Sequence, residues 1–182
     1  MLHDSTAYYQ YRVIFNQLIS EGKGNSKISA ELFYYLNHTG YNGLCRFNQK
    51  GGFNVPFGRY KTIHYETNFT AYQQAFVNWE FTSVDFTAIP IQCDDFIYAD
   101  PPYDVEFTQY SQVKFGWDEQ VCLAEWLAKH PGPVVLSNQA TERIVYLYEK
   151  LGYSLSYLDA PRRINCTGNR QPAREVLALK GL

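Results

Sequence analysis

The chain has 182 residues, 46% of them hydrophobic and 19% charged, with a formal net charge of −2. This length and composition suit one domain, or a core with a small insertion, and argue against long disordered tails. No apolar run approaches the roughly 20 residues that span a bilayer, and residues 1–4 do not open a signal peptide, so no membrane association is expected. The four scattered cysteines form no C-x-x-C pair, which argues against zinc or a disulfide framework and favours a cytoplasmic protein.

Hydrophobic periodicity and turn residues predict a first lobe over residues 1–65 and an α/β core over residues 66–182. The expected helices span residues 7–21, 29–36, 70–78, 119–129 and 142–151. The expected strands span residues 79–83, 95–99, 133–136, 153–159 and 175–179. Residues 41–58 form two extended runs around Lys50-Gly51-Gly52, which indicates a hairpin in the first lobe. From residue 79 onward strands alternate with helices, as in an α/β sheet.

Charge is distributed unevenly along the chain. Residues 41–61 carry basic and no acidic side chains. Residues 62–113 carry acidic side chains and no Lys or Arg, and residues 161–174 are again rich in arginine. A polyanion could bind the basic segments while the acidic segment serves another role. Ordinary solvated surface is the alternative explanation, and the charges alone do not decide between them.

The chemistry is expected at Asp100-Pro101-Pro102-Tyr103, which directly follows a predicted buried strand. Sites in open α/β sheets form beyond the carboxyl ends of strands. The Asp100 carboxylate and the Pro101 carbonyl supply two acceptors, and Tyr103 supplies an aromatic face. Two acceptors beside a ring suit a planar substrate with an NH₂ group, whose lone pair they aim at an electrophilic methyl carbon. A plain strand-to-loop turn is the alternative.

D-P-P-Y after a strand resembles motif IV of the amino-methyltransferases that use S-adenosylmethionine. The chain from about Ala7 to Leu179 resembles the Dam-type (class D12) DNA adenine methyltransferases, with the hairpin as the most specific signal. The similar segments are residues 8–12, 15–16, 41–48, 53–60, 107–110, 136–138, 163–165 and 175–177. The resemblance implies an incomplete Rossmann-like methyltransferase core with a helical-plus-hairpin target-recognition lobe.

The resemblance also implies roles for the residues of the core. The catalytic set is Asp100, Pro101, Pro102 and Tyr103: Asp100 and the Pro101 carbonyl hold the amine of a flipped adenine, and Tyr103 stacks on the base. The expected contacts to S-adenosylmethionine are Asp85, Phe86 and Asp100, with a strand-end cap as the alternative for Asp85. The aromatic residues at positions 107 and 110 could cover the base or belong to the core. No metal is expected.

Double-stranded DNA is the expected partner of the first lobe. Arg46 at the hairpin tip is expected to read a guanine edge, with a solvated charge as the alternative. Tyr41 and Asn42 are expected to fill the space left by the flipped base, and Leu44 and Pro56 to contact a thymine methyl. Arg59, Tyr60 and Lys61 are expected to contact phosphates. Asn48 and Asn54 complete the predicted DNA-binding set. The family analogy suggests a short site such as GATC.

The chain departs from the family at the cofactor motif. Family members begin with a strand and a glycine-rich F-x-G-x-G turn, and nothing in this sequence takes that place, since Gly22, Gly24, Gly51 and Gly52 lie in the recognition lobe. The sheet is therefore expected to lack its central strands, and an N-terminal segment or a partner chain would complete the cofactor site.

Three functions follow from these patterns. The first is a DNA adenine methyltransferase, in a restriction-modification, housekeeping or phage setting. The second is a truncated homologue that keeps DNA binding and has lost catalysis. The third, an amino-methyltransferase acting on cytosine, RNA or glutamine, is disfavoured by the Dam-like hairpin.

Overall fold

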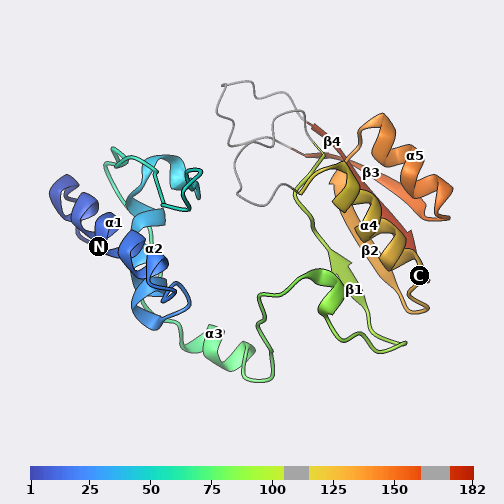
Figure 1. Cartoon of the computed structure of the whole chain (residues 1–182), viewed down its shortest axis with the longest axis horizontal. Coiled ribbons are helices and arrows are strands. Elements are labelled where there is room, and N and C mark those ends of the chain that lie inside the picture. The colour runs from blue at the N-terminus through green and yellow to red at the C-terminus, as the bar shows by residue number, and fades with distance from the viewer. Residues whose placement is uncertain (105–114, 161–172) are drawn as a thin grey trace. The chain divides into compact units, whose positions relative to one another are not determined.

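The computed structural model describes residues 1–104, 115–160 and 173–182, and the chain divides into two compact units (Figure 1). The first unit comprises residues 1–81, and the second begins at residue 82. This division lies later in the chain than the boundary at residue 65 that the sequence suggests. Residues that follow 65 are tied to the first unit through Tyr34, whose hydroxyl donates to the Glu66 carbonyl at 3.0 Å and accepts from the Glu66 amide at 2.8 Å.

Two helices frame the first unit, and both confirm predicted helices. α1 (Ser5–Ser20) begins where the Asp4 carboxylate accepts a hydrogen bond from the amide of Ala7, and α2 (Lys27–Thr39) begins at Ser26, whose hydroxyl caps the helix. Between the helices and the following loop lies a core made of the buried residues Tyr8, Phe15, Leu36, Phe53 and Val55. Burial of each such side chain contributes about 1.5–3 kcal/mol to stability.

The loop over residues 40–58 doubles back as a hairpin, but isolated bridges take the place of a regular ladder. Single antiparallel bridges join Gly40 to Phe57 and Phe47 to Phe53. Asn16 of α1 holds the second arm, because its Oδ1 accepts from the Phe53 amide at 2.7 Å and its Nδ2 donates to the Phe53 carbonyl at 3.1 Å. Helix contacts therefore shape this loop together with the two bridges.

Three short helical elements follow α2 in the chain, before the first strand of the sheet. They are η1 (Tyr41–Gly43), α3 (Thr70–Ala75) and η2 (Phe86–Ala88). α3 confirms a predicted helix. The strand predicted over residues 79–83 is wrong: these residues form no strand, and the side chains of Trp79 and Phe81 are 63% and 70% exposed. An apolar run becomes a strand only where another strand pairs with its backbone groups, and pairing depends on distant residues.

The second unit contains a mixed four-stranded sheet in the order β1-β2-β4-β3. Its strands are β1 (Ile97–Ala99), β2 (Val134–Gln139), β3 (Ser154–Ala160) and β4 (Ala173–Lys180). β1 runs parallel to β2, while β4 is antiparallel to both β2 and β3. Because the register aligns Ala99 with Leu136, the carboxyl ends of β1 and β2 lie side by side.

Helices α4 (Trp117–Ala128) and α5 (Glu142–Lys150) pack against the sheet and share one core with it (Figure 1). Alternate residues of β2 and β4 enter this core. Its most buried members are Ala124, Leu127, Val134, Leu136, Ile144, Tyr148, Val176 and Ala178. The predicted α/β class is confirmed, as are the four strands and two helices expected after residue 94.

Candidate functional site

Asp100 lies at the carboxyl end of β1, beside the residues that end β2. The hydroxyl of Ser137 donates a hydrogen bond to Oδ1 of Asp100 at 2.6 Å. Ser137 is 2% exposed, whereas Asp100 is exposed to solvent. A carboxylate offers about four acceptor sites, so Asp100 can accept further hydrogen bonds. Its side chain is therefore oriented from one side by β2 and accessible to a ligand from the other.

The other three residues of the predicted catalytic set continue the turn. Pro101 is buried, Pro102 is exposed and Tyr103 is half-buried. The Tyr103 hydroxyl donates to the carboxylate of Glu175 on β4 over 3.4 Å. Desolvation raises the pKa of Tyr103 above its ordinary value, so its phenol stays neutral at physiological pH.

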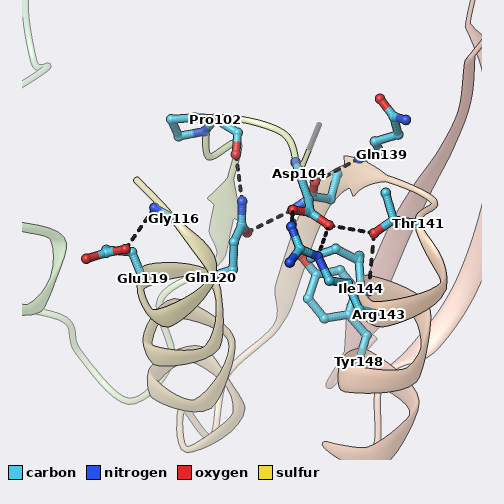
Figure 2. A network of polar contacts seen from close by, with 11 residues as sticks. Pro102, Asp104, Gly116, Glu119, Gln120, Gln139, Thr141, Arg143, Ile144 and Tyr148 are labelled. Atoms are coloured by element: carbon cyan, nitrogen blue, oxygen red, sulfur yellow. Dashed lines mark hydrogen bonds and ion pairs between the residues drawn. The ribbon is translucent and has the colours of Figure 1, made fainter. Parts of the chain in front are cut away.

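Two side-chain amides hold the backbone on either side of Tyr103, and Figure 2 shows one of them, Gln120, reaching the Pro102 carbonyl. Gln120 Nε2 on α4 donates to the Pro102 carbonyl at 2.7 Å, and Asn138 Oδ1 on β2 accepts from the Asp104 N–H at 2.9 Å. The two amides also contact each other, because Asn138 Nδ2 donates to Gln120 Oε1 at 2.9 Å. A continuous chain of hydrogen bonds thus runs from one end of the turn to the other.

Asn138 is completely buried, and all of its hydrogen-bonding capacity is used. Its Oδ1 also accepts from the amide of Gln139 at 2.8 Å, and its Nδ2 also donates to the hydroxyl of Tyr148 at 3.1 Å. Together with the bonds to Asp104 and Gln120, these contacts occupy both donor hydrogens and both acceptor positions. A buried amide satisfied in this way is held in one orientation.

Asp104 links the turn to the start of α5. Its carboxylate accepts hydrogen bonds of 2.7 Å from both Thr141 Oγ1 and Arg143 Nε, and it forms an ion pair with Arg143 (Figure 2). Desolvation raises the pKa of this buried carboxyl, but the hydrogen bonds and the charge of Arg143 outweigh it, so the pKa lies below its ordinary value. Asp104 is therefore ionised and bound to its partners at neutral pH.

An apolar cavity of about 490 Å³ adjoins Asp100. Asp100 and Pro101 line it together with five aromatic residues, which are Phe86, Phe96, Tyr98, Phe115 and Trp126. Tyr103 is not among the described residues that line this cavity. Aromatic walls with a carboxylate at one end fit a flat heterocycle that carries polar groups.

Asp85 and Phe86, the predicted cofactor contacts, lie at the start of η2. The exposed carboxylate of Asp85 accepts a hydrogen bond from the Thr87 amide at 2.9 Å, and its bonds with Thr87 keep the pKa of Asp85 below its ordinary value. Asp85 thus caps η2, a role close to the strand-end cap that is the alternative to cofactor binding. Phe86 lines the cavity. Contact of either residue with the cofactor stays a prediction.

In the first unit, a pocket of about 220 Å³ gathers four of the residues predicted to bind DNA. They are Tyr41, Asn42, Arg59 and Tyr60. Tyr41 and Arg59 are exposed, and Asn42 has a left-handed φ of 53°. The hydroxyl of Tyr60 is bound within the protein, because it donates to the Gly40 carbonyl at 2.7 Å.

Three other predicted DNA contacts bind partners inside the same loop. Arg46 Nε donates to Asn54 Oδ1 at 2.8 Å, and Arg46 Nη2 donates to the Asn54 carbonyl at 3.1 Å. Asn48 Oδ1 accepts from the amides of Lys50 and Gly52 and closes the turn. The guanidinium of Arg46 is therefore held in place, and its other N–H groups can serve a ligand.

The remaining predicted residues are distributed as follows. Leu44 is half-buried against the core of the first unit, and Pro56 and Lys61 are exposed. The aromatic residues 107 and 110 and the segment 163–165 lie outside the described residues.

Ser137, Asn138 and Gln120 have no role among the predictions made from the sequence. A signal for Ser137 and Asn138 was present, because they end the strand that follows β1 in the sheet, and the carboxyl ends of parallel strands meet. Gln120 carries no local signal, since its contact depends on how α4 packs against the sheet.

Neither a metal site nor a membrane-spanning helix is found in the described part of the chain. Within it, no group of three or more His, Cys, Asp or Glu side chains is arranged to hold a metal ion. No helix in the same ranges has the length and apolar character that crossing a membrane requires.

Comparison with known proteins gives a family match over most of the chain. Residues 2–164 match the family described as D12 class N6 adenine-specific DNA methyltransferase. The chain is 35% identical to the retron Ec67 DNA adenine methylase of Escherichia coli, 37% to a DNA adenine methylase of Vibrio cholerae and 34% to the type II methyltransferase M.MjaIII of Methanocaldococcus jannaschii.

These alignments cover nearly all of this chain but less of the relatives. They include 96%, 94% and 90% of this chain, and 62%, 64% and 60% of the three relatives in the same order. The chain therefore spans somewhat less than two thirds of the length of these curated relatives.

Proposed function

Because the chain belongs to the D12 class of N6 adenine-specific DNA methyltransferases, we propose that it transfers a methyl group from S-adenosylmethionine to the exocyclic amine of adenine in DNA. The observation that carries this proposal is the Asp100 carboxylate, which Ser137 orients at the end of β1 and which a ligand can reach. Family membership favours adenine in DNA over cytosine, RNA or glutamine as the acceptor.

The turn acts by holding the amine. A paired adenine amine is out of reach, so the base is extruded from the duplex. Asp100 accepts a hydrogen bond from one amine hydrogen and the Pro101 carbonyl accepts one from the other, which directs the nitrogen lone pair away from the ring. As nitrogen forms its new bond to carbon it becomes positive, and the carboxylate stabilises that charge until a proton leaves through Asp100 to water.

The cavity beside Asp100 suits part of the cofactor. When bound, S-adenosylmethionine supplies an electrophilic methyl carbon, and its sulfonium becomes a neutral thioether. The aromatic lining that includes Phe86 fits the adenine ring of the cofactor, while Asp85 and Asp100 supply acceptors for its polar groups.

We further infer that additional polypeptide, an N-terminal segment or a partner chain, completes the cofactor site within a Rossmann-like fold. β1 is an edge strand of the described sheet, and its residue Tyr98 and the adjacent Phe96 are 58% and 61% exposed. The sequence contains no glycine-rich turn after a core strand, and the relatives are longer than this chain.

The first unit is proposed to recognise a short, GATC-like site. Its support is the clustering of Tyr41, Asn42, Arg59 and Tyr60 around one pocket and the fixed guanidinium of Arg46 nearby in the chain. The absence of a glycine-rich cofactor turn supports the alternative, a homologue that binds DNA without methylating it.

Mass spectrometry of a GATC duplex incubated with S-adenosylmethionine and the chain, supplied together with the polypeptide that completes its cofactor site, tests the proposal. We expect N6-methyladenine with the unmodified chain and with Asp94→Ala, an exposed acidic control before β1, but not with Asp100→Ala. Duplex binding without product would favour the alternative, and product from Asp100→Ala would contradict the role of the carboxylate.

A further inference from the structure

We propose that Gln120 and Asn138 are positioning residues that orient Tyr103 toward the extruded base. This inference rests on the proposed function, in which Tyr103 supplies the stacking surface. Neither residue touches the substrate in this scheme. Both act through the backbone of the turn.

Gln120 and Asn138 bind the two peptide groups that flank Tyr103. The carbonyl that Gln120 binds belongs to the peptide group before Tyr103, and the N–H that Asn138 binds belongs to the one after it. Peptide groups are planar, so a fixed orientation of both planes restricts φ and ψ of the residue between them. The direction in which the Tyr103 side chain leaves the backbone is restricted in turn.

The prolines make these two contacts important. Pro101 and Pro102 have no backbone N–H. Neither residue can therefore donate a hydrogen bond that would fix the turn to a neighbouring strand. The Pro102 carbonyl and the Asp104 N–H are bound instead by side chains from two regular elements, α4 and β2.

The anchoring amides are themselves immobile. Gln120 is 3% exposed and Asn138 is completely buried, and they hydrogen-bond to each other. The Asp104 carboxylate adds a third attachment through Thr141 and Arg143 at the start of α5. The turn is therefore held from three elements while Asp100 stays exposed.

The ratio of the affinities for two DNA duplexes tests whether Gln120 and Asn138 position Tyr103 or only stabilise the fold. Two duplexes with a GATC site are compared, one with the target adenine opposite an abasic position and one in which the target itself is abasic. Stacking of a base on an aromatic ring is worth about 1–3 kcal/mol, so the unmodified chain should bind the first duplex roughly 5- to 150-fold more tightly. Because both affinities come from one preparation, any unfolded fraction cancels in the ratio.

Gln120→Glu is the sharpest variant. It keeps the shape of the side chain and an acceptor for Asn138, but it removes the donor to Pro102. We expect its affinity ratio to fall about fivefold or more, toward one, and Asn138→Leu to behave likewise. Tyr153→Phe is the matched control, because it removes a buried hydroxyl that donates to the Ala124 carbonyl of α4 rather than to Gln120 or Asn138, and it should keep the ratio of the unmodified chain.

The outcomes distinguish the two proposals. Unchanged ratios in folded Gln120→Glu and Asn138→Leu would overturn the positioning role and leave the proposed function intact. A ratio of one for the unmodified chain would overturn base capture at this turn, and the positioning role with it. If Asn138→Leu does not fold, Gln120→Glu decides the matter alone.

Discussion

The hydroxyl of Ser137 lies 2.6 Å from Oδ1 of Asp100, so the end of one parallel strand orients the carboxylate at the end of the next. We expect Ser137→Ala to lower the single-turnover rate of methyl transfer about 10- to 100-fold, because a misplaced catalytic group loses much of its effect. The affinity for duplex DNA should change little, because Ser137 is buried and the substitution keeps both the Tyr103 ring and the predicted DNA contacts of the first unit. Rapid quenching with radiolabelled cofactor and filter binding measure the two quantities.

Ser156→Ala provides the control for this prediction. Ser156 is an exposed serine on β3, in the same cross-strand row as Ser137 because both pair with Leu177, but β3 lies at the opposite edge of the sheet from β1 and Asp100. Its substitution should leave the rate unchanged. A similar loss in both variants would point to a general effect on the sheet, and an unaltered rate in Ser137→Ala would show that Asp100 needs no such orientation.

Arg46 and Asn54 form a pair whose contribution to sequence preference can be measured. Arg46→Ala is expected to weaken binding by about 1–3 kcal/mol and to relax the preference at one base pair. Since Asn54 holds Nε of the guanidinium, Asn54→Ala should relax the preference at the same position, and the double variant should resemble Arg46→Ala. Competition binding with duplexes that carry every substitution of the site gives these preferences.

Lys50→Ala is the charge-matched control in the same loop. Lys50 is exposed at the turn, and its loss should weaken binding equally for all duplexes. An equally uniform loss in Arg46→Ala would identify Arg46 as a phosphate contact and refute its role in readout.

The buried carboxylate of Asp104 predicts a loss of stability in acid. Its pKa in the folded protein lies below the ordinary value of 3.8, so the unfolded chain binds more protons in this range. The stabilisation is complete above the unfolded pKa and disappears as pH falls through the lower folded pKa. Urea unfolding followed by circular dichroism, repeated from about pH 7 down to about pH 3, measures the effect.

Asp104→Asn removes this titration. We expect it to unfold about 1–3 kcal/mol more readily at neutral pH and to approach the unmodified chain in acid, because protonation then removes from the unmodified chain the charge that the variant already lacks. Asp94→Asn, at an exposed position, should follow the unmodified chain throughout. Parallel curves for Asp104→Asn and the unmodified chain would refute the assignment.

The helices were predictable because their signals are local. Asp4 and Ser26 cap α1 and α2, and Thr141 caps α5, each with apolar residues at helical spacing behind it. The later strands were found because short apolar runs there alternate with helices. The run at residues 79–83 has similar composition but pairs with no strand in the described part of the chain, and the sequence contains no local sign of that difference.

The sequence by itself determined the chemical groups of the candidate site and the family, because D-P-P-Y and the hairpin segments are short contiguous patterns. The tertiary structure decided which side chains hold those groups. It joined Ser137 to Asp100, Gln120 to Pro102 and Asn138 to Asp104, and it bound Arg46 to Asn54 within the loop. The first three contacts join residues 37, 18 and 34 positions apart, and such hydrogen bonds form only when sheet register and helix packing bring their partners together.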